Sequence, residues 1–238
     1  MTSYRNIAKI KKGKEVDIII PAAGSGRRMK SYGCKPLIKI DGTSSIIDRQ
    51  IRIIRKNLNF EKIILITGFE SDRLMKNTPD DLLKVENERY ENTNVNRSIG
   101  MGLRVSESER ILIIYGDLVF NEALISNLPP LERSFVLVED HSNMSEDEVG
   151  CIVIDNRLEQ MLPDIPNKWC QISFFSGKEL EILKKISWDK KRETYFGFET
   201  INDIIDQGGI FYAHKISGSK ITDIDCSKDL DKVKEIIN

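Results

Sequence analysis

Two kinds of hydrophobic pattern alternate along the chain. Residues 16–21, 62–67 and 110–115 are short, almost continuously apolar runs, which is typical of strands buried on both faces of a sheet. Further runs predict strands in the second half, at residues 134–139, 149–155 and 170–175. Between these runs, apolar residues recur at helical spacing. The alternation predicts an α/β fold.

The predicted helices differ in strength. A helix that covers the sheet is expected after the possible N-caps at residues 43–45, because apolar residues recur there on one face: Ile47, Ile51, Ile54 and Leu58. Residues 95–105 have a helical pattern that two glycines weaken by about 1 kcal/mol each relative to alanine. Helices are also predicted at 178–186, at 199–207 and at the end of the chain, where Ser227 is a candidate N-cap and Leu230, Val233 and Ile237 share one stripe.

The composition is that of an ordinary globular protein. The chain has 238 residues, and its 36 Lys and Arg nearly balance 37 Asp and Glu, for a formal net charge of −1. This balance argues against a nucleic-acid-binding role. The apolar runs are far shorter than the roughly 20 residues that span a bilayer, so no membrane segment is expected.

The chain shows no internal repeat and no long linker. We therefore expect a basic leader at residues 1–14 and a single domain at 15–238. Four cysteines, at 34, 151, 170 and 226, are scattered without a CxxC pair. That spacing favours reduced thiols in the cytoplasm over a disulfide framework or a zinc site.

A glycine-rich loop directly follows the first predicted strand. Gly24 and Gly26 allow positive φ and close approach of the backbone, so successive N–H groups there can cradle phosphate oxygens. Arg28 and Lys35 can add charge-assisted contacts to the same oxygens. Taken alone, the loop could also be an ordinary turn between a strand and a helix.

Neither common nucleotide fingerprint fits this loop. GxxxxGK[ST] is absent, and GxGxxG would need glycine where the chain has Met29. The loop with Arg28, followed by Lys35-Pro36-Leu37, instead resembles the signature of the nucleotidyltransferases of the GT-A-like fold. Residues 26–35 look most like methylerythritol phosphate cytidylyltransferase, whereas residues 107–121 and 222–231 are more similar to the phosphocholine and phosphosugar cytidylyltransferases.

The resemblance implies a nucleotide site. The backbone and small side chains at the loop would bind the triphosphate: Ala22, Ala23, Gly24, Ser25 and Gly26. Arg28 and Lys35 would be the catalytic cations, on the β/γ-phosphates and the α-phosphate. The stretch 92–99 is similar to the TNN-x-x-S segment of the phosphocholine group, which would place Asn94 and Ser98 on the nucleotide. Plain helix capping is the alternative role for these polar residues.

Three aspartates are candidate metal ligands. Asp117 follows the predicted central strand, at the edge where open α/β sheets place ligands, although it could also be a turn residue. In the resembling family this position holds magnesium. Asp223 and Asp225 alternate along an extended segment and can face one ion, and the segment looks like the family's [ED]-I-[DN] ending. Carboxylates together with substrate phosphates are the ligands that Mg²⁺ prefers.

The resemblance implies a three-layer α/β/α fold with a mostly parallel mixed sheet and a Rossmann-type, GT-A-like nucleotide-binding core. It also implies a nucleotide-binding half at residues 15–120 and an acceptor-binding half at 121–238. It implies a Mg²⁺-dependent transfer of an NMP, with CMP favoured, from an NTP such as CTP to a phosphorylated acceptor, with release of pyrophosphate. The acceptor would be phosphocholine-like or a sugar phosphate, and a homodimer is plausible. A choline-like group would need aromatic rings, which in strands are more often core; the candidates are Trp169, Phe174, Phe175, Tyr195, Phe196 and Phe198.

Two other functions remain open from the sequence. A GT-A glycosyltransferase would share the fold and use a nucleotide sugar, but it would normally have a DxD motif where Asp117 is followed by Leu118 and Val119. A catalytically silent nucleotide-binding module is the other alternative. Retention of the expected charged positions argues against it.

Overall fold

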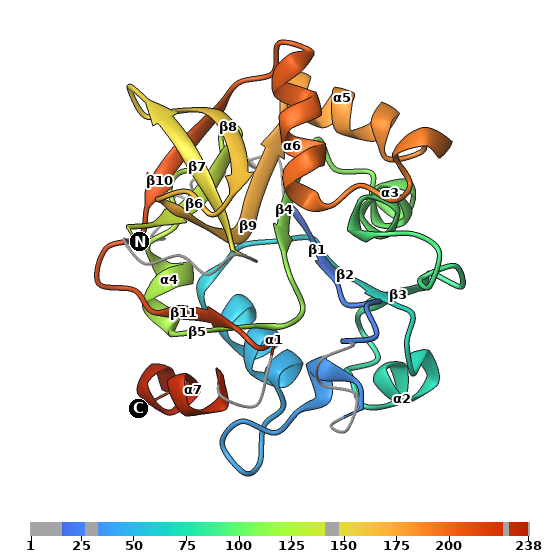
Figure 1. Cartoon of the computed structure of the whole chain (residues 1–238). Helices are drawn as coiled ribbons and strands as arrows, with labels where there is room; N and C mark the ends of the chain where they lie inside the picture. The colour runs from blue at the N-terminus through green and yellow to red at the C-terminus, as the bar shows by residue number, and fades with distance from the viewer. Residues whose placement is uncertain (1–15, 27–32, 141–147, 226–228, 238) are drawn as a thin grey trace, which may run out of the picture.

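The computed structural model describes residues 16–26, 33–140, 148–225 and 229–237. Its centre is a nine-stranded sheet with the strand order β3-β2-β1-β4-β9-β6-β10-β8-β7 (Figure 1). The strands are β1 Asp17–Pro21, β2 Lys62–Thr67, β3 Leu83–Glu86, β4 Arg110–Ile114, β6 Phe135–Glu139, β7 Val149–Ile154, β8 Arg157–Pro163, β9 Lys168–Ser176 and β10 Phe211–Lys215. The predicted leader, residues 1–14, lies outside the described residues.

The sheet is mixed and mostly parallel. β1 runs parallel to β2 and β4, β2 runs parallel to β3, and β10 runs parallel to β6. β9 lies antiparallel between β4 and β6, and β7 with β8 forms an antiparallel hairpin at one edge. The expected class of sheet is confirmed.

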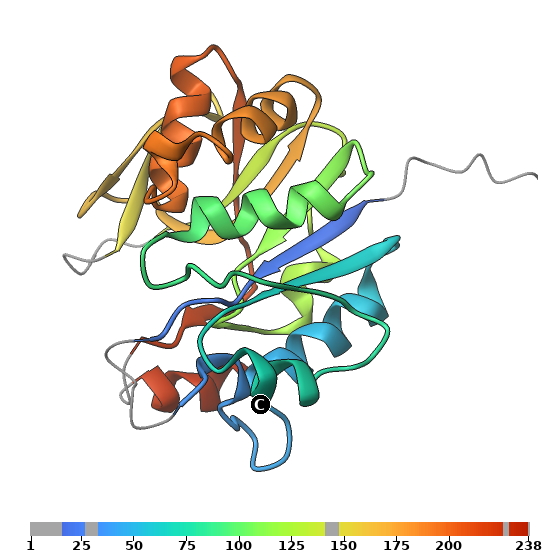
Figure 2. The same cartoon turned by 90° about the vertical axis from the view of Figure 1, so that its right-hand side faces the viewer.

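Helices cover both faces of this sheet, which gives three layers. They are α1 Ile46–Asn57, α2 Ser71–Lys76, α3 Val95–Val105, α4 Glu122–Ser126, α5 Gly177–Ile186, α6 Gly197–Asp206 and α7 Asp229–Ile237. Alternate residues of β1 point to opposite faces: Ile18 and Ile20 belong to the core on the α1 side, and Ile19 belongs to the core under α3, α5 and α6. Figure 2 shows α3 lying across the second face. Within the described residues, no helix is long and apolar enough to cross a membrane.

Helix α1 begins at a capping box and positions the end of β4. The Ser45 hydroxyl accepts a hydrogen bond from the Asp48 amide at 3.2 Å, and the Asp48 carboxylate accepts one from the Ser45 amide at 3.0 Å. In the same helix, the buried Gln50 amide donates to the carbonyls of Tyr115 at 2.9 Å and Leu118 at 2.7 Å. Gln50 therefore fixes the loop that carries Asp117.

The end of the chain returns to this same loop. Strand β11, Ile221–Asp223, pairs antiparallel with β5, Leu118–Phe120, in a separate two-stranded sheet. The amide of Ile224 then donates to the carbonyl of Asp117 at 3.2 Å. Helix α7 follows and buries Val233, as the stripe of apolar residues predicts, while its candidate cap Ser227 lies outside the described residues. Two segments more than a hundred residues apart thus meet beside β4.

Candidate active site

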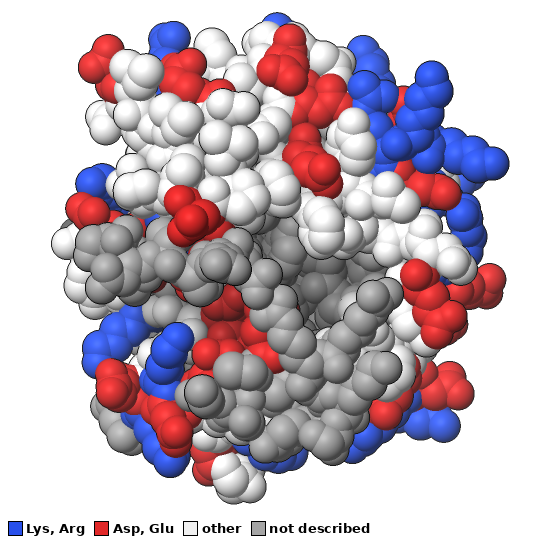
Figure 3. Space-filling view, viewed as in Figure 1, with Lys and Arg blue, Asp and Glu red and all other residues white. Residues whose placement is uncertain are grey.

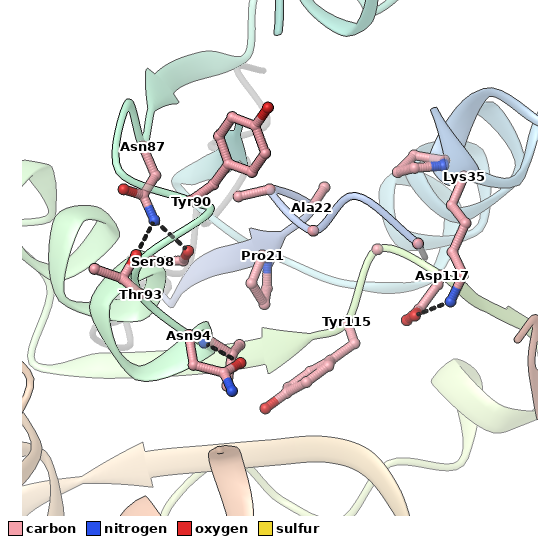
Figure 4. A pocket seen from close by; sticks show the side chains of 16 residues that line it. Pro21, Ala22, Lys35, Asn87, Tyr90, Thr93, Asn94, Ser98, Tyr115 and Asp117 are labelled. Carbon is pink, nitrogen blue, oxygen red and sulfur yellow. Dashed lines mark hydrogen bonds and ion pairs between the residues drawn. The ribbon is translucent and has the colours of Figure 1, made fainter. Parts of the chain in front are cut away.

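A cavity of about 220 Å³ opens where β1, β3 and β4 end and α3 begins (Figure 4). This edge is the carboxyl end of the parallel strands, where open α/β sheets bind ligands. Eight residues predicted from the sequence line the cavity: Ala22, Ala23, Gly24, Gly26, Lys35, Asn94, Ser98 and Asp117. Ser25 is described but is not part of the lining, and Arg28 lies outside the described residues.

The two glycines of the loop have different conformations. Gly26 has a φ of +54°, and a Cβ there would lie 3.1 Å from the Lys35 Cγ. Gly24 lies outside the left-handed region and has no atom within 4 Å of an added Cβ. Of these two glycines, only Gly26 therefore uses the positive φ that glycine allows. Gly24 leaves open space at the cavity, and Gly26 makes room for the stem of Lys35.

Lys35 is held between two of the predicted metal ligands. Its Nζ lies 3.1 Å from Asp117 Oδ2 and 2.6 Å from Asp225 Oδ1. Burial would lower the pKa of Lys35, but the two carboxylates outweigh this and raise the pKa above its ordinary value. Burial also raises the pKa of Asp117, and Asp223 and Asp225 add to the rise, while Lys35 opposes it. The ammonium is therefore charged at neutral pH.

Asp117 and Asp225 suit a hard divalent cation. Their oxygens already converge on one positive charge, the Lys35 ammonium. Over the described parts of the chain, no group of three or more His, Cys, Asp or Glu side chains could hold a metal. Two carboxylates are nevertheless sufficient for Mg²⁺, which usually completes its shell with water and substrate phosphates.

Asp223 belongs to a neighbouring charged cluster. Its carboxylate accepts from Lys168 at 3.2 Å and from the Gln171 amide at 3.3 Å, and Lys168 also pairs with Glu148 at 2.5 Å. Burial lowers the pKa of Lys168, but Asp223 and Glu148 outweigh it and raise the pKa. Asp223 and Asp225 therefore contact different lysines. Acidic side chains gather near the centre of this face, around β5 and β11 (Figure 3).

Lys168 and Gln171 reach Asp223 because β9 is irregular there. Pairing between β6 and β9 shifts between Val136 and Val138, and Gln171 has a φ of +56°. Such bulges redirect side chains, and they are frequent next to active sites. The sequence predicts a strand at 170–175 but gives no signal for the bulge, so neither residue was a candidate.

Asn87 is a second feature that the sequence did not predict. Its buried side-chain amide donates to the hydroxyls of Thr93 at 3.1 Å and Ser98 at 3.2 Å (Figure 4). Asn94 caps α3, as the alternative interpretation holds, and it also lines the cavity. Asn87 directly follows β3, and a polar residue at the end of a parallel strand can indicate a ligand site. The sequence did not predict β3, so Asn87 was not recognised.

Tyr115 joins the two halves of the chain at the cavity wall. Its ring lies edge-on to Trp169, with centroids 5.6 Å apart and an interplanar angle of 81°. Gly197, at the start of α6, has no room for a Cβ because the Tyr115 hydroxyl and the Trp169 ring lie against it. Trp169, Phe174 and Phe175 are buried in the core. These three rings are therefore not an exposed cage.

The fold and this arrangement of charges define a nucleotidyltransferase, an enzyme with a Rossmann-like, GT-A-like core. The sequence model of the MobA-like NTP transferase domain matches residues 18–144. The chain belongs to this family of MobA-like NTP transferases. No curated protein sequence shows a significant match.

Solved structures show the same fold at low sequence identity. CTP:phosphocholine cytidylyltransferase from Streptococcus pneumoniae superposes with a TM-score of 0.76 and 20% identity, over 94% of this chain and 100% of that one. The inositol-1-phosphate CTP transferase from T. maritima gives 0.75 and 21%, over 94% and 97%. A Bacillus anthracis protein assigned as a glucose-1-phosphate thymidylyltransferase gives 0.76 and 14%, over 92% and 94%.

Proposed function

We propose that this nucleotidyltransferase is Mg²⁺-dependent and moves an NMP, with CMP favoured, from an NTP to a phosphorylated small-molecule acceptor. Pyrophosphate is the second product. The observation that carries the proposal is the convergence of Lys35, Asp117 and Asp225 beside the cavity at the glycine-rich loop. Phosphoryl chemistry depends on positioning and on stabilising spread negative charge, so this set needs no additional nucleophile from the protein.

Each residue has a role in the transfer. The backbone at Gly24 and Gly26 binds the triphosphate, and Lys35 neutralises charge at the α-phosphate, where the acceptor oxygen attacks. The acceptor phosphate is already ionised at neutral pH, so it requires no base. Asp117 and Asp225 would hold Mg²⁺, which supplies positive charge for the triphosphate when bound. Arg28 keeps its proposed role on the β/γ-phosphates from the sequence resemblance.

The ribose and base would lie toward α3. Asn94 and Ser98 line the cavity there, and Asn87 holds Ser98 in place. The preference for CTP is supported by two of the similar structures, which are described as CTP-dependent transferases.

The acceptor would be phosphocholine-like or a sugar phosphate. The similar structures include enzymes described as acting on phosphocholine and on inositol-1-phosphate. Among the aromatic residues considered for a choline cage, Phe196 is 55% exposed and stacks on Phe198 with a centroid distance of 6.1 Å. The polar cluster of Lys168, Gln171 and Asp223 lines a separate small pocket beside Leu118 and offers hydrogen-bonding groups instead.

A panel assay tests this proposal. Purified protein with Mg²⁺ is incubated with each of CTP, UTP, dTTP, ATP and GTP and with phosphorylated acceptors, and pyrophosphate release is followed. We expect acceptor-dependent release that is fastest with CTP, and little release from an Asp117→Asn variant. Nucleotide-induced thermal stabilisation without release for any pair would instead indicate a silent nucleotide-binding module. Turnover of a nucleotide sugar would indicate a glycosyltransferase.

A further inference from the structure

Lys35 lies in the position that a metal ion would use. Its ammonium bridges Asp117 Oδ2 at 3.1 Å and Asp225 Oδ1 at 2.6 Å, and its side chain is only 10% exposed. Gly26 packs against its Cγ, Cδ and Cε atoms, and the following Pro36 is buried in the same short turn. The Lys35 and Asp117 side chains of the bridge are therefore largely buried, at 10% and 26% exposure, while the Asp225 side chain is 45% exposed.

The charges at this point allow one cation between the carboxylates. Lys35 balances one of the two negative charges of Asp117 and Asp225. A divalent ion bound to the same two oxygens would lie within a few ångströms of the ammonium, where like charges repel strongly in a partly buried site. Lys168 does not relieve this, because it is paired with Asp223 and Glu148. For a metal to enter, Lys35 must leave the carboxylates.

We propose that Lys35 and a divalent metal compete for Asp117 and Asp225, and that a bound triphosphate opens the carboxylate pair to the metal by drawing Lys35 onto its phosphates. The inference rests on the proposed nucleotide and metal sites. Lys35 thus has two roles, stabilising charge during transfer and keeping metal out before a nucleotide is bound. Because coupling between two binding sites is reciprocal, metal and triphosphate strengthen each other's binding by the same factor.

The test measures metal binding alone. Mn²⁺ serves as the probe, and its dissociation constant for the full chain is measured by electron paramagnetic resonance without nucleotide or acceptor. Lys35→Met removes the charge and keeps most of the stem, so it should bind Mn²⁺ on the order of 10-fold or more tightly than wild type. Lys35→Arg keeps the charge and should bind Mn²⁺ as weakly as wild type.

Lys39→Met is the matched control. Lys39 is four residues away and 56% exposed, and it pairs with Asp48 at 3.6 Å. Its loss removes the same formal charge from the protein, so Mn²⁺ affinity should stay at the wild-type value. Equal Mn²⁺ affinity in wild type and folded Lys35→Met, or an equal gain in Lys39→Met, would overturn the proposal.

A labelling measurement on the wild-type protein covers the case in which Lys35→Met does not fold. Saturating Mn²⁺ should release Lys35 from the carboxylates and increase its reaction with an amine reagent, read by mass spectrometry, while Lys39 stays unchanged. No increase at Lys35 would overturn the proposal. Neither measurement uses a nucleotide or an acceptor, so a failure of the proposed transfer reaction appears separately, in the pyrophosphate assay.

Discussion

Two lysines divide the carboxylates beside the end of β4. Lys35 forms salt bridges with Asp117 and Asp225, and Lys168 forms salt bridges with Asp223 and Glu148. Partly buried charges need such partners, because an unpaired one would carry a large desolvation cost. The neighbouring aspartates Asp223 and Asp225 therefore have different partners. Of the two lysines, Lys35 lines the cavity and Lys168 does not.

Lys35→Ala should lower kcat on the order of 10²-fold or more, because it removes one preorganised cation that stabilises charge in the transition state. Initial rates of pyrophosphate release at saturating substrates check this. Lys39→Ala, four residues away and exposed, should keep the wild-type rate. Wild-type turnover in Lys35→Ala would show that Lys35 has no role in the transfer.

Gly24 and Gly26 should respond differently to alanine. Gly26→Ala places a Cβ at positive φ against Lys35, so it should lose about 1 kcal/mol of unfolding free energy. Gly24→Ala meets no atom within 4 Å, so its stability should change by less than about 0.5 kcal/mol. Its new methyl group should still weaken triphosphate binding.

Urea unfolding and titration with CTP separate the two effects. The expected pattern is a stability loss for Gly26→Ala alone, together with weaker CTP binding by both variants. If Gly24→Ala binds CTP like wild type, the loop does not cradle the triphosphate.

Among the helices and strands, the sequence predicts best those whose own hydrophobic pattern is enough to define them. The continuous runs of β2 and β4 and the apolar face of α1 lie within a residue or so of their predicted bounds. The segment 95–105 is helical despite its glycines, which allow close packing. A Cβ at Gly100 would lie 2.8 Å from the Ser187 carbonyl oxygen, and one at Gly102 would lie 3.0 Å from the Ile19 side chain. Tertiary packing there outweighs helix propensity.

The short strands that the sequence did not predict are defined by their pairing with neighbouring strands and not by a hydrophobic pattern of their own. β3 is a four-residue edge strand with two exposed ends, and β5 and β11 have three residues each. These three short segments carry too little periodicity to be recognised. Strands β8 and β10, of seven and five residues, were also not predicted. The same limit applies to the site. The sequence gives the types of charged residues near β4, but the contacts of Lys168, Gln171 and Asn87 arise from a bulge and from unpredicted elements.

Asn87 offers a test of how the loop after β3 supports the cavity. Asn87→Ala leaves the hydroxyls of Thr93 and Ser98 without their shared donor, so we expect a loss of about 1–3 kcal/mol of unfolding free energy. The KM for the nucleotide should rise more than kcat falls, since Ser98 lines the cavity. Asn77→Ala, at the exposed end of α2, is the control and should leave KM unchanged. Equal KM and kcat values in the Asn87→Ala and Asn77→Ala variants would mean that Asn87 supports the fold and has no role in nucleotide binding.

Across the three layers of the fold, cysteine thiols are buried in the two hydrophobic cores. Cys34, Cys151 and Cys170 are free and buried in the cores on either side of the sheet. Burial, with a smaller contribution from Glu70, raises the pKa of Cys34 to about 11, and burial raises the pKa of Cys151 to about 12.

The raised thiol pKa values make stability fall in alkaline solution. The folded protein keeps each thiol protonated, whereas the unfolded chain loses the proton above about pH 8.5, the ordinary pKa of a thiol. The unfolding free energy is therefore unaffected below about pH 8.5 and falls as the pH rises toward 11. Between pH 8 and pH 10 the unfolding free energy should fall by roughly 2 kcal/mol for each such thiol. Urea unfolding at both pH values should show a smaller fall in Cys34→Ala than in wild type. An identical fall in both proteins would mean that Cys34 does not contribute.

The proposed reaction joins an NMP to an acceptor phosphate. It is tested by incubating the protein with Mg²⁺, CTP labelled at the α-phosphorus and phosphorylated acceptors, and by following the label with chromatography. We expect the label to enter a diphosphate-linked product and pyrophosphate to form in equal amount. Label that stays in CTP, or appears only as CMP at a rate independent of acceptor, would contradict it.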